Sequence, residues 1–425
     1  MSELRVVGKP VIRKDALTKA LGTAVYAGDL YRPGMLIGKA LRSRYPHARI
    51  ISIDTAAAEK LPGVHAVMTH KDIPGINRFG LSILDQPVLA DDKVRMMGDA
   101  VALVAAESEE IAQEALSLIK VEYEELPGYF TVEEALAEDA LPIHEGGNLL
   151  QHTKVRKGNV EEGFAKSDII VENVYQTQRV DHAYIEPETS LAEVDSDGNL
   201  TVYTSTQYPF RDRRQIAPVV NLPVNKVRVV QMVTGGAFGG KDDITTEIQA
   251  SLLALKTGRP VKVVWDRRES MISSTKRHPM KIWVKTGATK DGLLMAVEGK
   301  IYSDKGAYCS IGHFITKKAG LHLAGPYYVP HVKVDTYAVY TNNTICGPYR
   351  GFGILQVCFA HESQMDILAE KLGLSPLEIR LKNALRHGLS TATGQVFQQG
   401  VGFYDTLLKA KEYMEKYPLE EVSDR

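Results

Sequence analysis

Two glycine-rich segments, each set between a strand-like run and a helix-like run, constrain this chain more than any other feature. Gly235-Gly-Ala-Phe-Gly-Gly-Lys241 follows the β-branched run 227–233, and a segment with apolar residues at helical spacing comes after it. Cys346-Gly-Pro-Tyr-Arg-Gly-Phe-Gly353 follows the run 332–339 and precedes a helix-like segment that begins near Ile354. Alternating strands and helices predict an α/β chain, of mixed α+β character.

A third junction of the same kind carries Gln207. This residue follows the strand-like run 200–204 and precedes Pro209, which suits the first turn of a helix. Ligands of α/β proteins gather beyond the carboxyl ends of strands. We therefore expect Gln207, the loop 235–241 and the loop 346–353 to converge in one crevice.

The first part of the chain predicts a strand–helix–strand unit. Residues 101–105 form a short buried-strand run, residues 111–119 repeat at helical spacing behind the N-cap candidate Ser108, and residues 121–123 alternate as a strand. A chain of 425 residues is expected to form at least two domains. The segment 138–158 contains Pro142, Gly146 and Gly147 and shows no periodicity, so we place the domains at 1–145 and 146–425.

Composition excludes several classes of protein. The chain has 51 Lys+Arg against 52 Asp+Glu, and it has no basic block that would hold a nucleic acid. The N-terminus is charged where a signal peptide is apolar, and no apolar run is long enough to cross a bilayer, so we expect a cytoplasmic protein without membrane contact. The three cysteines, Cys309, Cys346 and Cys358, show no CxxC spacing, which argues against a zinc site or a self-contained iron–sulfur cluster.

The loop 235–241 also fits the phosphate-binding spacing G-x-x-x-x-G-K. Asp242 stands where that motif has a Ser or Thr, and its carboxylate would repel phosphates. A phosphate-loop nucleotide-binding protein remains an alternative, as does a non-catalytic scaffold in which the glycines only allow close packing. Phe238, an aromatic residue among four glycines, is either anchored in a core or aimed at a flat ligand.

Two further patterns have alternative interpretations. The segment Arg350-Gly-Phe-Gly353, taken alone, is also compatible with a helix-capping turn that has Phe352 packed beneath it. His182 and Glu186 stand four residues apart, as two metal ligands on one helical face would. Pro187 ends any such helix and no third ligand is near, so a buried hydrogen-bonded pair is favoured over a metal site.

Taken together and in this order, the motifs resemble those of the molybdenum hydroxylases of the xanthine oxidase and aldehyde oxidase family, in their molybdopterin-binding part. The resemblance covers practically the whole chain and implies an α/β hammerhead domain followed by the first molybdopterin-binding domain. Besides the two glycine-rich segments it rests on Gly8-Lys-Pro-x-x-Arg13, Thr23-Ala-x-Tyr-Ala-x-Asp29, Gly98-Asp-Ala-Val-Ala-Leu-Val104, Val121-Glu-Tyr-Glu-Glu-Leu-Pro127, His182-x-x-x-Glu-Pro187, Ser205-Thr-Gln207 and Pro376-x-x-x-Arg-x-x-Asn383.

The resemblance implies roles for individual residues. Gln207 would approach the molybdenum from its apical side, and the backbone around Gly236, Phe238 and Gly239 would contact the oxygen ligands of the metal. Arg350 would hold the cofactor region. No protein side chain would ligate the metal directly, because the pterin supplies the sulfur ligands.

The implied reaction is hydroxylation of a carbon next to a ring nitrogen or a carbonyl, with oxygen taken from water. The family's glutamate base lies beyond the point where this sequence ends, so we expect it on a second molybdopterin subunit that shares the cofactor. A 2Fe-2S cluster and FAD are expected on further subunits, and the pterin is expected in its cytosine dinucleotide form.

The substrate is expected to be a small aromatic molecule that contacts Phe352. Counted without gaps, Asp242 and Lys318 occupy the positions of a glutamate and an arginine that orient substrate in the purine enzymes. An N-heteroaromatic acid such as nicotinate is our first choice, and a purine or another aromatic ring is the alternative. For Lys318 the alternative is a solvated pair with Lys317 on a helix.

Overall fold

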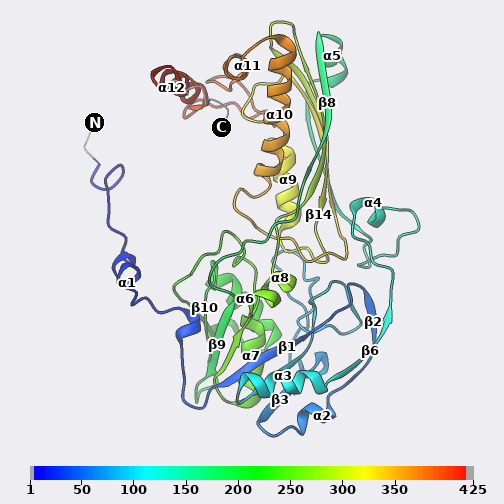
Figure 1. The fold of residues 1–425 in the computed structure, drawn as a ribbon, viewed down its shortest axis with the longest axis vertical. Helices are drawn as coiled ribbons and strands as arrows, with labels where there is room; N and C mark the ends of the chain where they lie inside the picture. The colour runs from blue at the N-terminus through cyan, green and yellow to red at the C-terminus, as the bar shows by residue number, and fades with distance from the viewer. Residues whose placement is uncertain (1–3, 418–425) are drawn as a thin grey trace, which may run out of the picture.

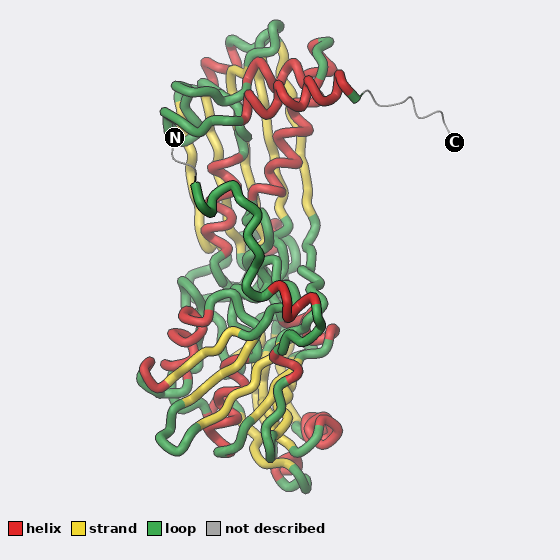
Figure 2. Tube along the Cα trace, turned by 90° about the vertical axis from the view of Figure 1, so that its left-hand side faces the viewer, coloured by secondary structure: helices red, strands yellow, loops and turns green. Residues whose placement is uncertain are grey.

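The computed structural model describes residues 4–417 as two lobes stacked along the long axis (Figure 1). The lower lobe contains a seven-stranded and a three-stranded sheet, and the upper lobe contains a five-stranded sheet with long helices against one face. Figure 2 shows the molecule from the side, where the strands of the upper lobe run along the long axis. The mixed helices and sheets confirm the predicted α/β fold class.

The seven-stranded sheet joins strands from both predicted domains. Leu36 on β1 pairs with Val261 on β12 in parallel, although the two strands lie far apart in sequence. The domain boundary between residues 145 and 146 therefore divides the strands of one sheet, and it stays a prediction. In spatial order the strands are β11 (Val227–Gln231), β10 (Leu200–Thr204), β9 (Thr189–Val194), β12 (Val261–Val264), β1 (Leu36–Arg42), β5 (Ala100–Ala106) and β3 (Val64–Met68).

Strand β5 shows why this sheet has helices on both faces. Leu103 and Ala105 belong to the core cluster that includes the inner face of α7, whereas Ala102 and Val104 belong to the cluster beneath α3. A strand buried on both faces reads as a continuous apolar run, as this one does. The covering helices are α6 (Pro209–Val219), α7 (Glu247–Thr257), α2 (Ala56–Glu59) and α3 (Glu109–Leu118).

The predicted strand–helix–strand unit is confirmed in its elements. The Ser108 hydroxyl accepts a hydrogen bond from Ile111 N at 3.3 Å and so caps α3, as expected. The strand after α3 joins the separate three-stranded sheet and not the sheet of β5. That sheet consists of β4 (Lys93–Val94), β2 (Ala48–Asp54) and β6 (Lys120–Glu125).

The upper lobe is built on a mainly antiparallel sheet, in which only β14 and β15 pair in parallel among the described residues. Two helices, α9 (Gly312–His322) and α10 (Ile354–Leu372), contribute to its apolar core. The strands, in spatial order, are β7 (Leu149–Lys157), β15 (His331–Val339), β14 (Leu294–Asp304), β13 (Met280–Ala288) and β8 (Ile169–Thr177). The other helices of the chain are α1 (Ala16–Ala20), α4 (Val132–Ala135), α5 (Val160–Ala165), α8 (Arg267–Ser273), α11 (Pro376–Asn383) and α12 (Phe403–Lys416).

Two local predictions are confirmed by the structure, and a third is corrected. Helix α6 begins at Pro209 and α10 begins at Ile354, both as expected. Strand β11 ends at Gln231, two residues before the predicted end, and Val233 beyond it forms an isolated parallel bridge with Tyr26. Within residues 4–417, no helix combines the length and the apolar character needed to cross a membrane.

Candidate functional site

The three predicted junctions converge, and they do so where the two lobes meet. Gly239 N donates to Gln207 Oε1 at 3.1 Å, and Gln207 N donates to the carbonyl of Lys241 at 2.9 Å. Arg350 N donates to the carbonyl of Phe238 at 2.8 Å. Gln207 and Phe238 lie beyond β10 and β11 of the lower lobe, whereas Arg350 follows β15 of the upper lobe. The predicted site therefore forms where loops from two sheets meet, whereas the sequence had suggested the edge of one sheet.

Gly239 makes the close approach of the two loops possible. Its φ is +102°, and a Cβ atom there would lie 2.8 Å from the carbonyl oxygen of Pro348. Any other residue would push the loop 346–353 away from the loop 235–241. The side chains on this side of the loops are open to solvent: Gln207 and Arg350 are exposed, and Phe238 is 50% exposed.

A buried network that the sequence analysis missed holds the loop 235–241 from the other side. Glu186 Oε2 accepts hydrogen bonds from Lys241 Nζ at 2.8 Å, from Gly235 N at 2.6 Å and from Ser205 Oγ at 2.7 Å. Burial lowers the pKa of Lys241, and the Glu186 carboxylate opposes that shift. The sequence contained two hints of this network: Lys241 lies in a glycine-rich loop, and Glu186 lies in the apolar context Ala-Tyr-Ile-Glu-Pro. Nothing in their spacing indicated that Lys241 and Glu186 form an ion pair.

This network rules out the phosphate-loop geometry. Lys241 is 2% exposed and faces Glu186 and Ser205, so its ammonium group does not point toward a ligand. Helix α7 begins only at Glu247, so no helix N-terminus directly follows the lysine as a phosphate loop requires. The loop holds its position through the lysine and presents its backbone and Phe238 to the crevice.

His182 and Glu186 do not share a helical face, and they do not bond to each other. The segment 181–187 is irregular, and Ala183 has a φ of +49°. The His182 Nε2 atom lies 2.7 Å from the carbonyl of Pro348, and the ring stacks on Tyr349 at 4.4 Å. Burial lowers the pKa of His182 to about 4, so the ring is neutral near pH 7. The prediction that His182 and Glu186 bond to each other is therefore wrong, although both side chains form hydrogen bonds within the protein.

Phe352 and Lys318 lie together at the upper side of the crevice. The Lys318 ammonium lies 5.3 Å from the centre of the Phe352 ring, in a cation–π contact. Lys318 is half-buried on α9, whereas its neighbour Lys317 is exposed. Phe352 and Phe238 have φ values of +50° and +53°, a strained conformation for an aromatic residue that is typical of functional loops.

Among the described residues, Asp242 pairs with Arg211 and not with Phe352 or Lys318. Its carboxylate is 5% exposed and accepts a hydrogen bond from Arg211 Nη1 at 3.0 Å. Burial and the neighbouring Asp243 raise the pKa of Asp242 to about 6, and Arg211 opposes that rise. In this structure the carboxylate faces protein, so its assignment to substrate binding stays a prediction.

The crevice offers hydrogen-bond donors and aromatic surface but no ligand cluster for a bare metal ion. Among residues 4–417, no group of three His, Cys, Asp or Glu side chains is arranged to hold a metal. Because Gln207 Oε1 accepts from Gly239, the amide Nε2 is the end of this side chain that is left to donate to a ligand. Such a set fits a metal that arrives with its own ligands on an organic cofactor.

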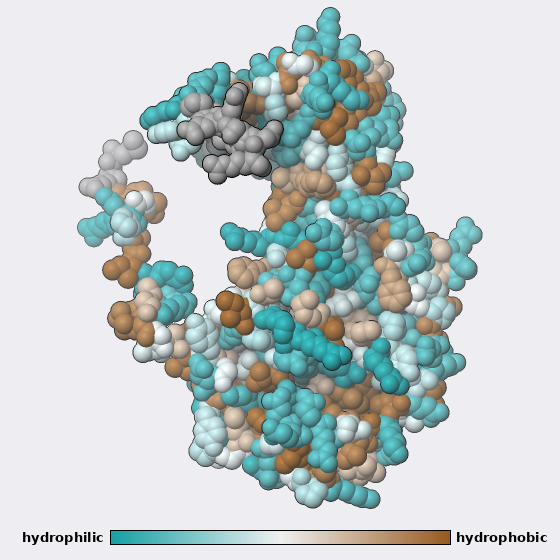
Figure 3. Space-filling view, in the orientation of Figure 1, coloured by the Kyte–Doolittle hydropathy of each residue, from teal (hydrophilic) through white to brown (hydrophobic). Residues whose placement is uncertain are grey.

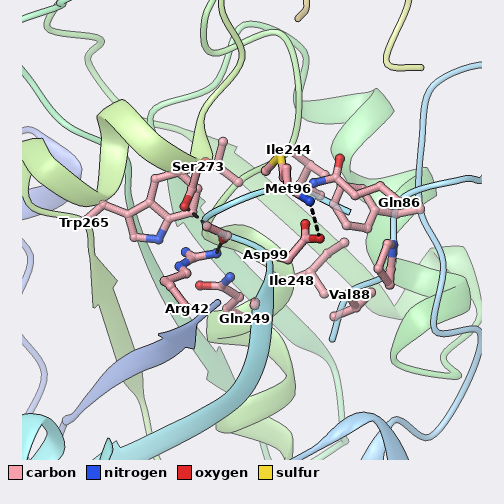
Figure 4. Close-up of a pocket in the computed structure, with 15 residues that line it drawn as sticks. Arg42, Gln86, Val88, Met96, Asp99, Ile244, Ile248, Gln249, Trp265 and Ser273 are labelled. Atoms are coloured by element: carbon pink, nitrogen blue, oxygen red, sulfur yellow. Dashed lines mark hydrogen bonds between the residues drawn. The ribbon is translucent and has the colours of Figure 1, made fainter. Parts of the chain in front are cut away.

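A cavity elsewhere in the lower lobe does not compete with this site. It has a volume of about 40 Å³ and lies between β5, α7 and the segment around Met96. Figure 4 shows Arg42, Trp265 and Gln249 gathered at one end, and Asp99 and Met96 at the other. Trp265 Nε1 and Gln249 Oε1 have no protein partner there. A polar cavity of this size suits ordered water and not a cofactor.

The comparisons with known families agree with this geometry. The family described as "Molybdopterin cofactor-binding domain" matches residues 143–384. The family described as "Aldehyde oxidase and xanthine dehydrogenase, a/b hammerhead domain" matches residues 21–127. The glycine-rich loops and Gln207 all fall within the first of these ranges.

Related proteins fall into two groups by length. The nicotinate dehydrogenase large molybdopterin subunit of Eubacterium barkeri is 47% identical over 96% of this chain and 96% of its own length. A probable xanthine dehydrogenase subunit of Bacillus subtilis is 48% identical over 89% of this chain, but the match spans only 51% of that protein. This chain thus spans nearly all of one relative and about half of the other.

Solved structures give the same result. The aldehyde oxidoreductase from Desulfovibrio gigas superposes with a TM-score of 0.91 at 35% identity, over 95% of this chain and 46% of that one. Quinoline 2-oxidoreductase from Pseudomonas putida 86 superposes with a TM-score of 0.89 at 31% identity, over 96% of this chain and 54% of that one. With its hammerhead and molybdopterin-binding domains and its crevice between the lobes, the chain belongs to the xanthine oxidase and aldehyde oxidase family of molybdenum hydroxylases, as a molybdopterin-binding subunit.

Proposed function

We propose that this chain forms one half of the active site of a molybdenum hydroxylase that acts on an N-heteroaromatic carboxylate such as nicotinate. The observation that carries the proposal is the meeting of the loops of Gln207, Gly239 and Arg350, with the side chains of Gln207 and Arg350 exposed to solvent. The family assignment makes this crevice the candidate cofactor site. When bound, molybdenum on molybdopterin transfers oxygen derived from water and accepts two electrons.

The residues of the crevice position the reacting groups. In this proposal the Gln207 amide would donate to the bound cofactor, and the backbone around Gly236, Phe238 and Gly239 would line its site, with the Gly239 N–H holding Gln207 Oε1 in place. Arg350 places a positive charge beside the cofactor. Donors held in place before the reaction stabilise charge as it develops, without reorganising during the step.

The substrate ring lies against Phe352, and Lys318 pairs with its carboxylate. Support comes from the Lys318–Phe352 contact, which places an ammonium group and an aromatic ring side by side. An aromatic acid has both complementary features in one molecule. The name of the Eubacterium barkeri relative, a nicotinate dehydrogenase subunit, supports the same choice. Because some relatives are named xanthine dehydrogenase subunits, a purine is the second candidate substrate.

Other polypeptides complete the enzyme in this proposal. A second molybdopterin subunit supplies the glutamate base and the remainder of the cofactor site, and 2Fe-2S and FAD subunits carry the electrons away. Support comes from the relative's printed name, a "large molybdopterin subunit", over nearly its full length. The three cysteines, of which Cys309 and Cys346 are buried, offer no cluster site of their own. The cytosine dinucleotide form of the pterin belongs to the same proposal.

The experiment is turnover by the co-expressed complex on nicotinate, nicotinamide, quinoline and xanthine, with molybdenum content measured on the same sample. We expect hydroxylation of nicotinate with the highest kcat/KM. Faster turnover of xanthine would move the substrate to the purines. A molybdenum-loaded complex that turns over none of the four would refute the assignment to N-heteroaromatic substrates.

A further inference from the structure

Two segments project from the body on the side of the molecule that Figure 1 places at the left. The N-terminal arm, residues 4–25, leaves the lower lobe, and helix α12 extends from the upper lobe. Figure 2 views that side directly and shows the arm and the helix in front of the body. Figure 3 shows open space between the arm and the body.

The N-terminal arm exposes apolar side chains that it does not bury itself. Ile12 is 89% exposed, and Leu4, Val6, Val7, Val11, Leu17 and Leu21 are all more than half exposed. The hydrogen bonds of Arg13, Lys19 and Thr23 close on the arm itself. A protein surface does not usually present so many neighbouring apolar side chains unless another molecule covers them.

Helix α12 is docked over its first half only. Phe403 meets the Tyr327 ring edge-on at 5.7 Å, and the Arg386 guanidinium lies 3.8 Å from the centre of the Tyr404 ring. The apolar stripe that starts at Phe403 continues at helical spacing to Met414, which is exposed, as is Tyr413. The second half of the helix therefore presents an apolar face beyond the edge of the body.

Apolar side chains are also exposed on the predicted site loops and on the neighbouring segment 181–187 and helices α9 and α10. We call this set the apolar rim: Ile185, Phe238, Phe314, Leu355 and Phe359, with Ile185 at 93% exposure. The arm starts at the rim, because Tyr26 pairs with Val233 just before the loop 235–241. The Tyr26 ring would lie only 3.4 Å from a Cβ atom on Gly235. The arm thus begins beside the loop that carries Phe238.

The relatives indicate what covers this face. The Desulfovibrio gigas structure holds this fold within a chain of about twice its length, since the match spans 46% of that chain. In the Eubacterium barkeri relative the same length is nearly the whole polypeptide. In the proposed function, the complementary half is a separate chain. The charge of the arm also indicates the chemistry of the partner. Residues 4–25 contain five basic side chains and a single acid, Asp15, so an acidic partner surface would be complementary.

We infer that the N-terminal arm, the second half of α12 and the apolar rim form one docking surface for a second molybdopterin-binding polypeptide, whose contact to the arm is apolar with an acidic border. This inference rests on the proposed function and adds which surface makes the complex. The partner closes the crevice from the side on which Gln207 and Arg350 are exposed. The arm and α12 hold the partner from both lobes.

The test uses a second polypeptide from the same organism. This polypeptide resembles the half of the Bacillus subtilis relative that the present chain does not match. The test measures the Kd between the two polypeptides. The variants are Ile12→Asp with Leu17→Asp on the arm, and Tyr413→Asp with Met414→Asp on α12. Ile51→Asp on β2, 53% exposed, is the matched control. We expect each double variant to raise Kd by about tenfold to a hundredfold, and the control to raise it less than about twofold. Added salt should weaken binding further, through the basic arm.

Each outcome decides the inference. Because the substituted side chains are exposed and lie outside the apolar cores, the variants should keep the unfolding midpoint of the parent chain. Parent-like Kd values in both double variants would overturn the inference, and a molybdenum-loaded complex in that case would leave the proposed function standing. Self-association of the chain through the arm, without binding of the second polypeptide, would make a second copy the occupant and overturn it. Full molybdopterin loading on the chain alone would count against the proposed function itself.

Discussion

The loop 235–241 turns one side to the protein interior and the other to the crevice, and the two sides carry different residues. On the inner side, Lys241 is buried against Glu186 and Ser205. On the outer side, Phe238 is half-exposed and the Gly239 amide meets Gln207. Lys241, which makes the loop resemble a phosphate-binding loop, has a structural role. The groups that face outward are the Gln207 amide, the loop backbone and the aromatic ring of Phe238. The two sides should respond differently to substitution.

The inner side should give the largest effect. Lys241→Met leaves the Glu186 carboxylate buried without its ion-pair partner, and the loss of one member of a buried pair costs about 3–5 kcal/mol. We expect a lower midpoint in denaturant unfolding and loss of the cofactor with the fold. The double variant Lys241→Met with Glu186→Gln should recover part of the stability. A single variant as stable as the parent would show that the inner network does not hold the loop.

The outer side should show the opposite pattern, with activity lost and stability kept. Gln207→Ala in the loaded complex removes one preorganised donor, so kcat should fall by about tenfold to a thousandfold with little change in KM. Gln231→Ala, an exposed glutamine at the end of β11, is the matched control. Unchanged kcat at normal molybdenum content would return Gln207 to a purely structural role at the loop contact.

Lys318 and Lys317 sharpen the comparison on a single helix. Lys318 contacts Phe352, whereas Lys317 is exposed. Lys318→Met should raise KM for a carboxylated N-heterocycle by about tenfold to a hundredfold, because the carboxylate loses its counter-charge. Nicotinamide should be affected much less, and Lys317→Met should change neither KM. Equal losses for the acid and the amide would show that Lys318 does not recognise the carboxylate.

Asp242 should give the smallest effect, visible in the pH dependence of stability. Burial and Asp243 raise its folded pKa to about 6, above its value of 3.8 in the unfolded chain. The folded state therefore binds more protons between these values, and this group's contribution to stability is lost as pH rises from about 4 through 6. Relative to Asp242→Asn, the parent should lose about 1–2 kcal/mol between pH 4 and pH 7. A constant difference across that range would contradict the raised pKa.

Local elements and the meeting of the three junctions could be predicted from the sequence. Helix α3 carries its signals within a few residues, in the Ser108 cap and the apolar spacing, and α7 ends at Gly258 with a φ of +65°. The crevice could be predicted because each junction places a loop after a strand. These patterns depend on neighbours in sequence, which is why a single sequence reveals them.

The long-range pairings could not be predicted in this way. Nothing in Leu36 or Val261 specifies that their strands are neighbours, and the sharing of one sheet by both predicted domains follows from that pairing. The spacing of His182 and Glu186 suggested a helix, but each side chain found a partner far away, at Pro348 and at Lys241. The partners of a buried polar side chain depend on tertiary packing, which a single sequence does not show.

The most direct test of the account is the molybdenum content of this chain purified alone and purified after co-expression with the second molybdopterin polypeptide. The crevice presents Gln207, Gly239 and Arg350 from this chain, while the proposed base and the other side of the cofactor site lie on the partner. We predict about one molybdenum per complex and almost none on the chain alone. Stoichiometric molybdopterin on the chain alone, or a stable complex without molybdenum, would contradict the shared site.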